Sequence, residues 1–346
     1  MTQHLYLHIP LCKTICTFCD FKRELMCDYD PKKVVTYLVK QLKRFKNKQF
    51  KTIYLGGGTP NALDNNDLNY LLSHLKPLTN NRCEFTIECN PDLITENQIK
   101  VMKINKVNRI SLGVQSTNNR ILRLLNRLHS IETCYTAVSL LQKHGFKNIS
   151  ADFIYALPLL KVSDVNDAIE FVVKNHLTHI SFYGLDLKPG SMLTKQHYQI
   201  NQDDEADQLE AAIIGLAKNG YERYEVSNWA INKKYRSQHN LAYWYTKDWA
   251  AVGYGAHGLE KRISYEYINS INKPIKRSRK MNPKKYFLQI LIMGLRLLEG
   301  IDISIEPYKS AYNYYKDKLK FVHIKNKKLV CDNINLLNNS IIDLFE

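Results

Sequence analysis

Three cysteine side chains lie close together near the start of the sequence. Cys12, Cys16 and Cys19 have the spacing C-x-x-x-C-x-x-C and directly follow a short apolar run. Cysteine thiolates are ligands of iron–sulfur clusters, and a [4Fe-4S] cluster held only by protein uses four of them, one for each iron. Three thiolates leave one iron without a protein ligand. The spacing therefore predicts a [4Fe-4S] centre with an open iron at which a small molecule can bind.

Zinc and a disulfide are the alternatives for these cysteines. Cys16-x-x-Cys19 can form half of a zinc site, and the best second half is His176 with His179, far along the chain. A disulfide is disfavoured because no secretory segment is evident and the cytosol keeps thiols reduced. The remaining cysteines form no second cluster motif, so one cluster is expected. They are Cys27, Cys83, Cys89, Cys134 and Cys331.

The cysteine loop resembles that of the radical SAM enzymes, and Phe18 before the third cysteine is typical of them. The resemblance implies that Cys12, Cys16 and Cys19 hold the cluster and that S-adenosylmethionine binds the open iron. In that family an electron from the cluster cleaves S-adenosylmethionine to a 5′-deoxyadenosyl radical. The sequence Tyr-x-His-Ile-Pro-x-Cys from Tyr6 onward indicates the branch of oxygen-independent coproporphyrinogen III oxidase and its haem-chaperone relatives.

The elements that must position this loop follow a regular rhythm. Apolar runs rich in β-formers alternate with helical patterns about every thirty residues, which is typical of βα units. Strands are expected near 4–9, 51–55, 84–89, 109–114, 149–155 and 178–185, and helices near 31–45 and 65–75. Thr95 and Gln98 have capping-box spacing for a further helix. Six units predict an α/β fold whose parallel sheet curls into a partial (β/α)6 TIM-like barrel.

The periodicity changes beyond about residue 196. Helices near 203–217 and 283–298 flank short aromatic strands. We expect residues 1–195 to form the radical SAM barrel with its cluster and S-adenosylmethionine sites. Residues 196–346 are expected to form a smaller C-terminal α+β domain that closes the mouth of the barrel.

Polar and glycine residues follow the predicted strands at their carboxyl ends, where barrel enzymes place their sites. The run Gly56-Gly57-Gly58-Thr59-Pro60 is either a tight turn or a ligand cradle. Glu88 and Asp152 are acids inside apolar runs, for which a structural ion pair is the alternative. The resemblance makes these positions contacts to S-adenosylmethionine or its surroundings. The full set is Tyr6, Phe18, Gly57, Gly58, Thr59, Glu88, Gln115, Arg127 and Asp152.

Two further features bear on function. His239-Asn240-x-x-Tyr243-Trp244 resembles a motif of the haem-chaperone branch, and an imidazole beside aromatic rings can bind haem. A hydrogen-bonded core histidine is the alternative for His239. Phe21 stands where the oxidases carry a fourth motif cysteine.

The resemblance therefore favours a chaperone that binds haem and delivers it to an acceptor protein. The alternatives are a decarboxylase that removes carbon dioxide from the propionates of coproporphyrinogen III, and a radical SAM enzyme with another substrate. No catalytic residue is assigned.

The net charge of +16, from 49 Lys plus Arg against 33 Asp plus Glu, favours anionic partners such as a porphyrin's propionates. The densest basic run, 273–285, has no aromatic residue for base stacking, so we interpret it as a solvated loop and expect no nucleic-acid binding. No apolar run reaches membrane-spanning length and no secretory signal is evident. A cytoplasmic protein is expected; peripheral membrane contact and a homodimer remain open.

Overall fold

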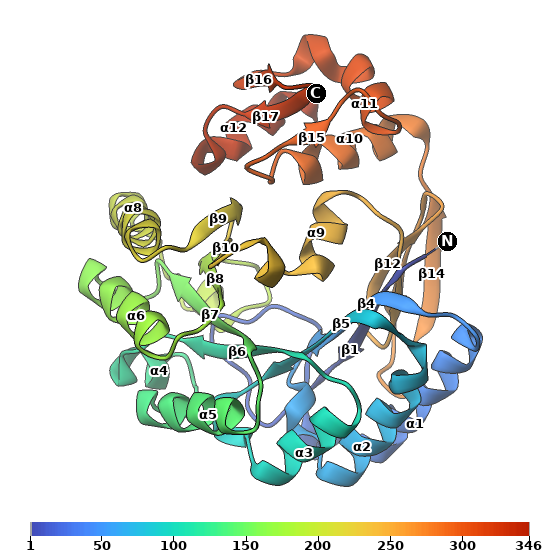
Figure 1. Ribbon diagram of the computed structural model, residues 1–346, viewed down its shortest axis with the longest axis vertical. Helices are drawn as coiled ribbons and strands as arrows, with labels where there is room; N and C mark the ends of the chain where they lie inside the picture. Colours follow the sequence, from blue (N-terminus) through green and yellow to red (C-terminus); the bar gives the residue numbers. More distant parts are fainter. Residues whose placement is uncertain (1, 346) are drawn as a thin grey trace.

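Six parallel strands form the centre of the molecule. The computed structural model describes residues 2–345 (Figure 1). The six strands are hydrogen-bonded neighbours in chain order, which is the arrangement of a βα barrel that is left open. They are β1 (His4–Ile9), β4 (Phe50–Gly57), β5 (Thr79–Cys89), β6 (Arg109–Gln115), β7 (Asn148–Tyr155) and β8 (His179–Gly184). The predicted partial barrel and all six strands are confirmed.

Helices surround the strands on the outside (Figure 1). They are α1 (Pro31–Leu42), α2 (Asn65–Leu75), α3 (Glu96–Ile104), α4 (Asn119–Leu124), α5 (Ile131–Lys143), α6 (Val162–Lys174) and α8 (Gln202–Lys218), with the short α7 (Met192–Lys195) before α8. Asp30 caps α1, and Thr95 caps α3 by accepting from the Gln98 backbone N–H. The side chain of Gln98 instead donates to the Asn61 carbonyl at 2.8 Å, so only half of the predicted capping box forms.

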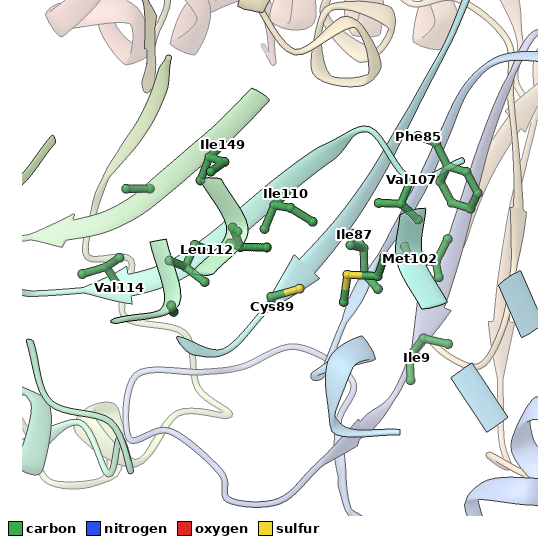
Figure 2. Close-up of a cluster of buried hydrophobic side chains, with 14 of the residues drawn as sticks. Ile9, Phe85, Ile87, Cys89, Met102, Val107, Ile110, Leu112, Val114 and Ile149 are labelled. Atoms are coloured by element: carbon green, nitrogen blue, oxygen red, sulfur yellow. The ribbon is translucent and has the colours of Figure 1, made fainter. Parts of the chain in front are cut away.

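Each barrel strand alternates between an apolar outer face and a polar inner face. Outward residues of β5 and β6, such as Ile87 and Ile110, are fully buried against the helix layer, where Met102 of α3 meets them (Figure 2). Inward residues bond to one another across strands, as Ser111 does to Asp152 at 2.7 Å. The interior of this barrel is therefore a hydrogen-bonded polar space that can receive a polar ligand.

The sheet continues beyond the barrel on both sides. β11 (Trp249–Val252) pairs with β1 in parallel, and β12 (His257–Glu260), β13 (Ile263–Ile268) and β14 (Ile275–Lys280) follow antiparallel. β10 (Asn228–Ala230) and β9 (Glu222–Glu225) extend the other edge. The expectation of a loop at 273–285 is wrong, because β14 is an exposed edge strand. Its charges keep that open edge from pairing with other chains.

The chain ends in a unit with its own apolar core. It contains α10 (Pro283–Gly294), β15 (Ile301–Asp302), α11 (Tyr308–Tyr315), β16 (Val322–Lys325), β17 (Lys328–Cys331) and α12 (Leu337–Ile341). The helix α9 (Gln238–Trp244) lies between this unit and the barrel (Figure 1). Backbone N–H groups of α9 donate to Glu84, near the amino half of β5.

The domain boundary at 195 and the closing of the mouth stay predictions. Residues 222–280 contribute strands to the barrel sheet, and the contacts of α9 lie at the amino ends of the strands. Among residues 2–345, no helix has the length and apolarity needed to cross a membrane.

One glycine is required by a close approach between β11 and β1. Gly253 has φ of +105°, and a Cβ there would lie 2.3 Å from the His8 carbonyl oxygen. Gly220 has φ of +79° but no atom within 4 Å of its virtual Cβ.

Gly220→Ala should lower the free energy of unfolding by about 1–2 kcal/mol, the cost of left-handed backbone. Gly253→Ala should cost about 1–3 kcal/mol more because of overpacking. Urea denaturation measures both, and equal losses would contradict this assignment.

Candidate metal centre

The cysteine loop is held at both ends by the barrel. After β1, the short β2 (Leu11–Cys12) pairs in parallel with β3 (Glu24–Leu25), which encloses residues 13–23. His8 points from β1 to the Lys22 carbonyl, with 2.7 Å between Nε2 and the oxygen. In the middle of the loop, the Thr17 hydroxyl donates to the Leu124 carbonyl at 3.1 Å. The loop is thus held by contacts that do not involve the cysteine thiols.

A cavity of about 500 Å³ opens beside this loop, at the carboxyl ends of the barrel strands. The structure brings nearly all the predicted site residues to its wall: Cys12, Cys16, Phe18, Cys19, Gly57, Gly58, Thr59, Glu88, Gln115, Arg127 and Asp152. Tyr6 and His239 are not part of the wall. A cavity of this size is typical of small-molecule and cofactor sites.

The three thiols fit a cluster better than a single ion. Burial raises the pKa of Cys12 and raises that of Cys19 to about 11, so metal binding must displace their protons. The Thr59 hydroxyl lies 3.6 Å from the Cys12 Sγ. Among the side chains that the structure describes, no three His, Cys, Asp or Glu residues converge on one ion position. A [4Fe-4S] cluster needs no such convergence, because each thiolate binds its own iron.

The zinc alternative loses its second pair of ligands. His179 begins β8, so it lies at the amino end of the barrel rather than beside the cysteines. Its Nδ1 lies 2.8 Å from the Ser150 hydroxyl and its Nε2 lies 2.8 Å from the Tyr224 hydroxyl. Both ring nitrogens are therefore engaged inside the barrel.

Two carboxylates face the cysteines across the cavity. Glu88 accepts from the Tyr54 hydroxyl at 2.8 Å and from the Gly57 N–H at 3.0 Å, yet burial raises its pKa to about 7. Asp152 accepts from Ser111 at 2.7 Å and from Ser150 at 3.0 Å, and burial raises its pKa as well. These carboxylates can accept hydrogen bonds from the hydroxyl or ammonium groups of a polar ligand.

The glycine run serves close packing within the protein. A Cβ at Gly56 would lie 2.8 Å from the Glu88 carboxylate, and one at Gly58 would lie 2.7 Å from the Leu11 carbonyl oxygen. The N–H groups of Gly58 and Thr59 donate to carbonyls of β1 and the cysteine loop, at 2.7 and 2.8 Å. The run is thus required for strand and loop packing, and its contact with a ligand stays a prediction.

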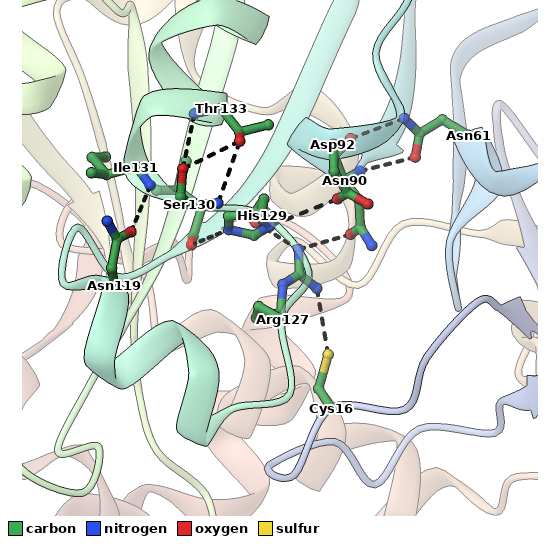
Figure 3. A network of polar contacts seen from close by, with 12 residues as sticks. Cys16, Asn61, Asn90, Asp92, Asn119, Arg127, His129, Ser130, Ile131 and Thr133 are labelled. Atoms are coloured by element: carbon green, nitrogen blue, oxygen red, sulfur yellow. Dashed lines mark hydrogen bonds and ion pairs between the residues drawn. The ribbon is translucent and has the colours of Figure 1, made fainter.

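Arg127 connects the cysteine loop to the neighbouring strands (Figure 3). Its Nη1 lies 3.4 Å from the Cys16 Sγ, and its Nη2 donates to Asn90 and to the Gly113 carbonyl, each at 2.8 Å. Asn61 fixes Asn90 in turn through its side-chain oxygen, at 2.9 Å from the Asn90 N. The guanidinium is therefore already oriented toward the cavity. Its predicted pairing with a cofactor carboxylate stays a prediction.

Tyr6 and His239 lie inside the barrel, away from the wall of this cavity. The Tyr6 hydroxyl is 2.9 Å from His8 Nδ1, and its ring stacks on Tyr54 with centroids 6.1 Å apart. His239 is fully buried, with Nδ1 2.6 Å from the Thr52 hydroxyl and Nε2 2.7 Å from the Tyr243 hydroxyl. This geometry is that of a hydrogen-bonded core histidine, and its role as a haem ligand stays a prediction.

Several residues of the site escaped the sequence analysis. Tyr54 holds Glu88, His8 holds the end of the cysteine loop, and Arg23 donates to the carbonyls of Cys19 and Phe21. The polar residues at every second position of the strands were the available signal. That alternation identifies inward-facing groups but not their partners.

Comparisons with known proteins agree with this geometry. The family model "Radical SAM superfamily" matches residues 6–172. The heme chaperone HemW of Lactococcus lactis subsp. lactis is 32% identical, with 94% of this chain and 90% of the relative covered. That of Buchnera aphidicola subsp. Schizaphis graminum is 30% identical, with 93% and 92% covered. The structure of coproporphyrinogen III oxidase (HemN) from Escherichia coli has a TM-score of 0.82 at 18% identity, covering 99% of this chain and 90% of that chain, which shows the shared fold.

The fold and the cysteine loop thus define a radical SAM protein, a class whose cofactors are a [4Fe-4S] cluster and S-adenosylmethionine. Within that superfamily, the chain belongs to the family of the heme chaperone HemW.

The cysteine assignment can be tested by removing one ligand. Cys16→Ala should abolish cluster assembly while leaving the fold intact, because the strand pair β2–β3, His8 and Thr17 also hold this loop. Cys27→Ala, at an exposed cysteine, is the matched control and should assemble the cluster normally. Iron content and visible absorption after anaerobic reconstitution measure the result, and circular dichroism checks the fold. Unchanged iron content in Cys16→Ala would refute the assignment.

The raised pKa of Glu88 should appear in the pH dependence of stability. Since its folded pKa of about 7 exceeds its ordinary value of 4.5, the folded state binds more protons between these values, and stability falls as pH rises through them. The full shift corresponds to about 3 kcal/mol at most, and less because the carboxylate borders the cavity. Cluster-free Glu88→Gln should therefore lose less stability than wild type between pH 5 and pH 8. Urea denaturation measures this, with Glu170→Gln at an exposed site as control; parallel curves for all three proteins would contradict the assignment.

Proposed function

We propose that this protein binds haem and passes it to an acceptor protein, and that it carries a [4Fe-4S] cluster and S-adenosylmethionine in the cavity beside the cysteine loop. The observation that carries the proposal is the similarity to heme chaperones, which extends over 94% of the chain at 32% identity. Phe21 supports it as well. This residue lines the cavity and is 63% exposed, so no fourth thiol extends the motif there.

The residues of the cavity take distinct roles in this proposal. Cys12, Cys16 and Cys19 hold the cluster, which supplies one electron to S-adenosylmethionine when both are bound. Glu88 and Asp152 accept hydrogen bonds from the amino and hydroxyl groups of S-adenosylmethionine. Burial raises the pKa values of both acids, and a cationic ligand would oppose that shift by favouring the ionised carboxylates.

Gly57, Gly58 and Thr59 form the wall beside the cluster, with Phe18, Gln115 and Arg127 around the remaining ligand atoms. We assign Arg127 to the carboxylate of S-adenosylmethionine, because a guanidinium can bind a carboxylate in a bidentate way.

The partners follow from the same proposal. Haem carries two propionates, which suit a chain with a net charge of +16. The acceptor is a haem-binding protein, and we place the process in the cytoplasm. The basic strand β14 lacks the interleaved aromatic residues of a nucleic-acid surface.

The chaperone and the decarboxylase differ in what they do to a porphyrin. The reconstituted protein, incubated anaerobically with S-adenosylmethionine, a low-potential reductant and coproporphyrinogen III, should leave the porphyrin unchanged by mass spectrometry. The same protein should bind haemin and yield it to apomyoglobin, a convenient haem acceptor. Loss of two carboxyl groups from the porphyrin would instead establish the decarboxylase, and absence of haemin binding would remove the chaperone proposal.

A further inference from the structure

A second cavity, of about 730 Å³, lies at the amino ends of the barrel strands, opposite the cysteine loop. We call it the amino-end cavity. The starts of β1, β4 and β5 form one wall and α9 with the segment after it forms another. The lining residues are Gln3, His4, Gln49, Lys51, Thr52, Asn80, Asn81, Arg82, Gln238, Leu241, Ala242, Tyr245 and Lys247. Its volume is in the range of small-molecule sites.

The lining of the amino-end cavity combines cations, carboxamides and a small apolar surface. Lys51, Arg82 and Lys247 contribute three cations, and no Asp or Glu belongs to the lining. Leu241 and Tyr245, both half-buried, supply apolar surface from α9 and its carboxyl end. A ligand with anionic groups, and with an apolar surface that can contact Leu241 and Tyr245, fits this lining.

His4 gives this cavity a metal-binding group. Its Nδ1 lies 2.9 Å from the Thr52 hydroxyl, while its Nε2 has no hydrogen-bond partner within residues 2–345. Burial, together with the charges of Lys51 and Lys247, lowers its pKa to about 4. The imidazole is therefore neutral at physiological pH, which is the form that ligates metals.

Thr52 links the protonation of the His4 ring to that of the His239 ring. Its hydroxyl has one proton and two imidazole neighbours, His4 Nδ1 at 2.9 Å and His239 Nδ1 at 2.6 Å. When Thr52 donates to His239, it accepts from the Nδ1–H of His4, and Nε2 of His4 keeps its lone pair. A ring nitrogen held by such a hydrogen bond orients the other nitrogen toward a metal.

We propose that the amino-end cavity is the haem site, with His4 Nε2 on the iron and Lys51, Arg82 and Lys247 around the propionates. The inference rests on the proposed haem-binding function and gives it a location. His239, which the sequence favoured as a ligand, is fully buried and does not line this cavity. It acts here as a positioning residue, because it shares the Thr52 hydroxyl with His4 and lies 6.4 Å from it between ring centroids.

The test is a titration of the reconstituted holoprotein with haemin, followed by Soret difference spectra and by electron paramagnetic resonance of the ferric haem. Wild type should bind one haemin with the signature of histidine ligation. His4→Ala should lose that signature and bind at least tenfold more weakly. His74→Ala, an exposed histidine on α2, is the matched control and should behave as wild type.

A second pair of variants keeps the test valid if His4→Ala fails to fold. Lys51→Glu with Lys247→Glu changes two exposed side chains, and Lys100→Glu with Lys195→Glu makes the same charge change far from the cavity. The first double variant should bind haemin at least tenfold more weakly than the second, with the histidine signature retained.

The outcomes separate the two proposals. If wild type binds no haemin, the haem-binding function fails. If wild type binds haemin and neither His4→Ala nor the Lys51 and Lys247 variant differs from its control, the location fails and the function stands.

Discussion

The burial of polar groups inside the barrel is the constraint on which the rest of the structure depends. A charged or polar side chain removed from water costs several kcal/mol unless it is hydrogen-bonded. Glu88, Asp152 and Arg109 all face this interior, and each has a partner on another strand of the barrel. Those bonds form only when the strands keep their observed register. The apolar outer face secures that register, since a slip by one residue would turn it inward. The ligand groups are therefore positioned by the same forces that stabilise the fold.

The polar interior also connects the two ends of the barrel. His4 and His239 share the Thr52 hydroxyl, and the His239 ring stacks on Tyr54 with centroids 5.1 Å apart. Tyr54 donates to Glu88 at the cofactor cavity. The amino-end cavity and the cofactor cavity are thus joined by direct contacts. Such a network can carry energetic coupling if its groups have two arrangements, and the shared hydroxyl of Thr52 supplies two.

Sequence reasoning reached the elements because their signals are local. The period of the apolar residues predicted the strands, and the cysteine spacing placed three thiols in one loop. The sequence could not predict that His8 bonds to the Lys22 carbonyl or that Tyr54 bonds to Glu88, because those contacts depend on the strand register and on the path of the loop. The same limit explains the error at 273–285, since a lysine-rich strand at a sheet edge lacks the apolar alternation of a half-buried strand. The motif around His239 indicated a functional residue, but it could not show that both ring nitrogens bond to the hydroxyls of Thr52 and Tyr243.

The two ends of the barrel offer different charged and metal-binding groups to a ligand. The cofactor cavity presents acids with raised pKa values opposite three thiols, which suits a cationic ligand beside a metal cluster. The amino-end cavity presents three cations and a neutral imidazole, which suits an anionic ligand that carries its own metal. In the proposed arrangement S-adenosylmethionine and haem occupy opposite ends of the barrel, where one can be bound while the other is exchanged.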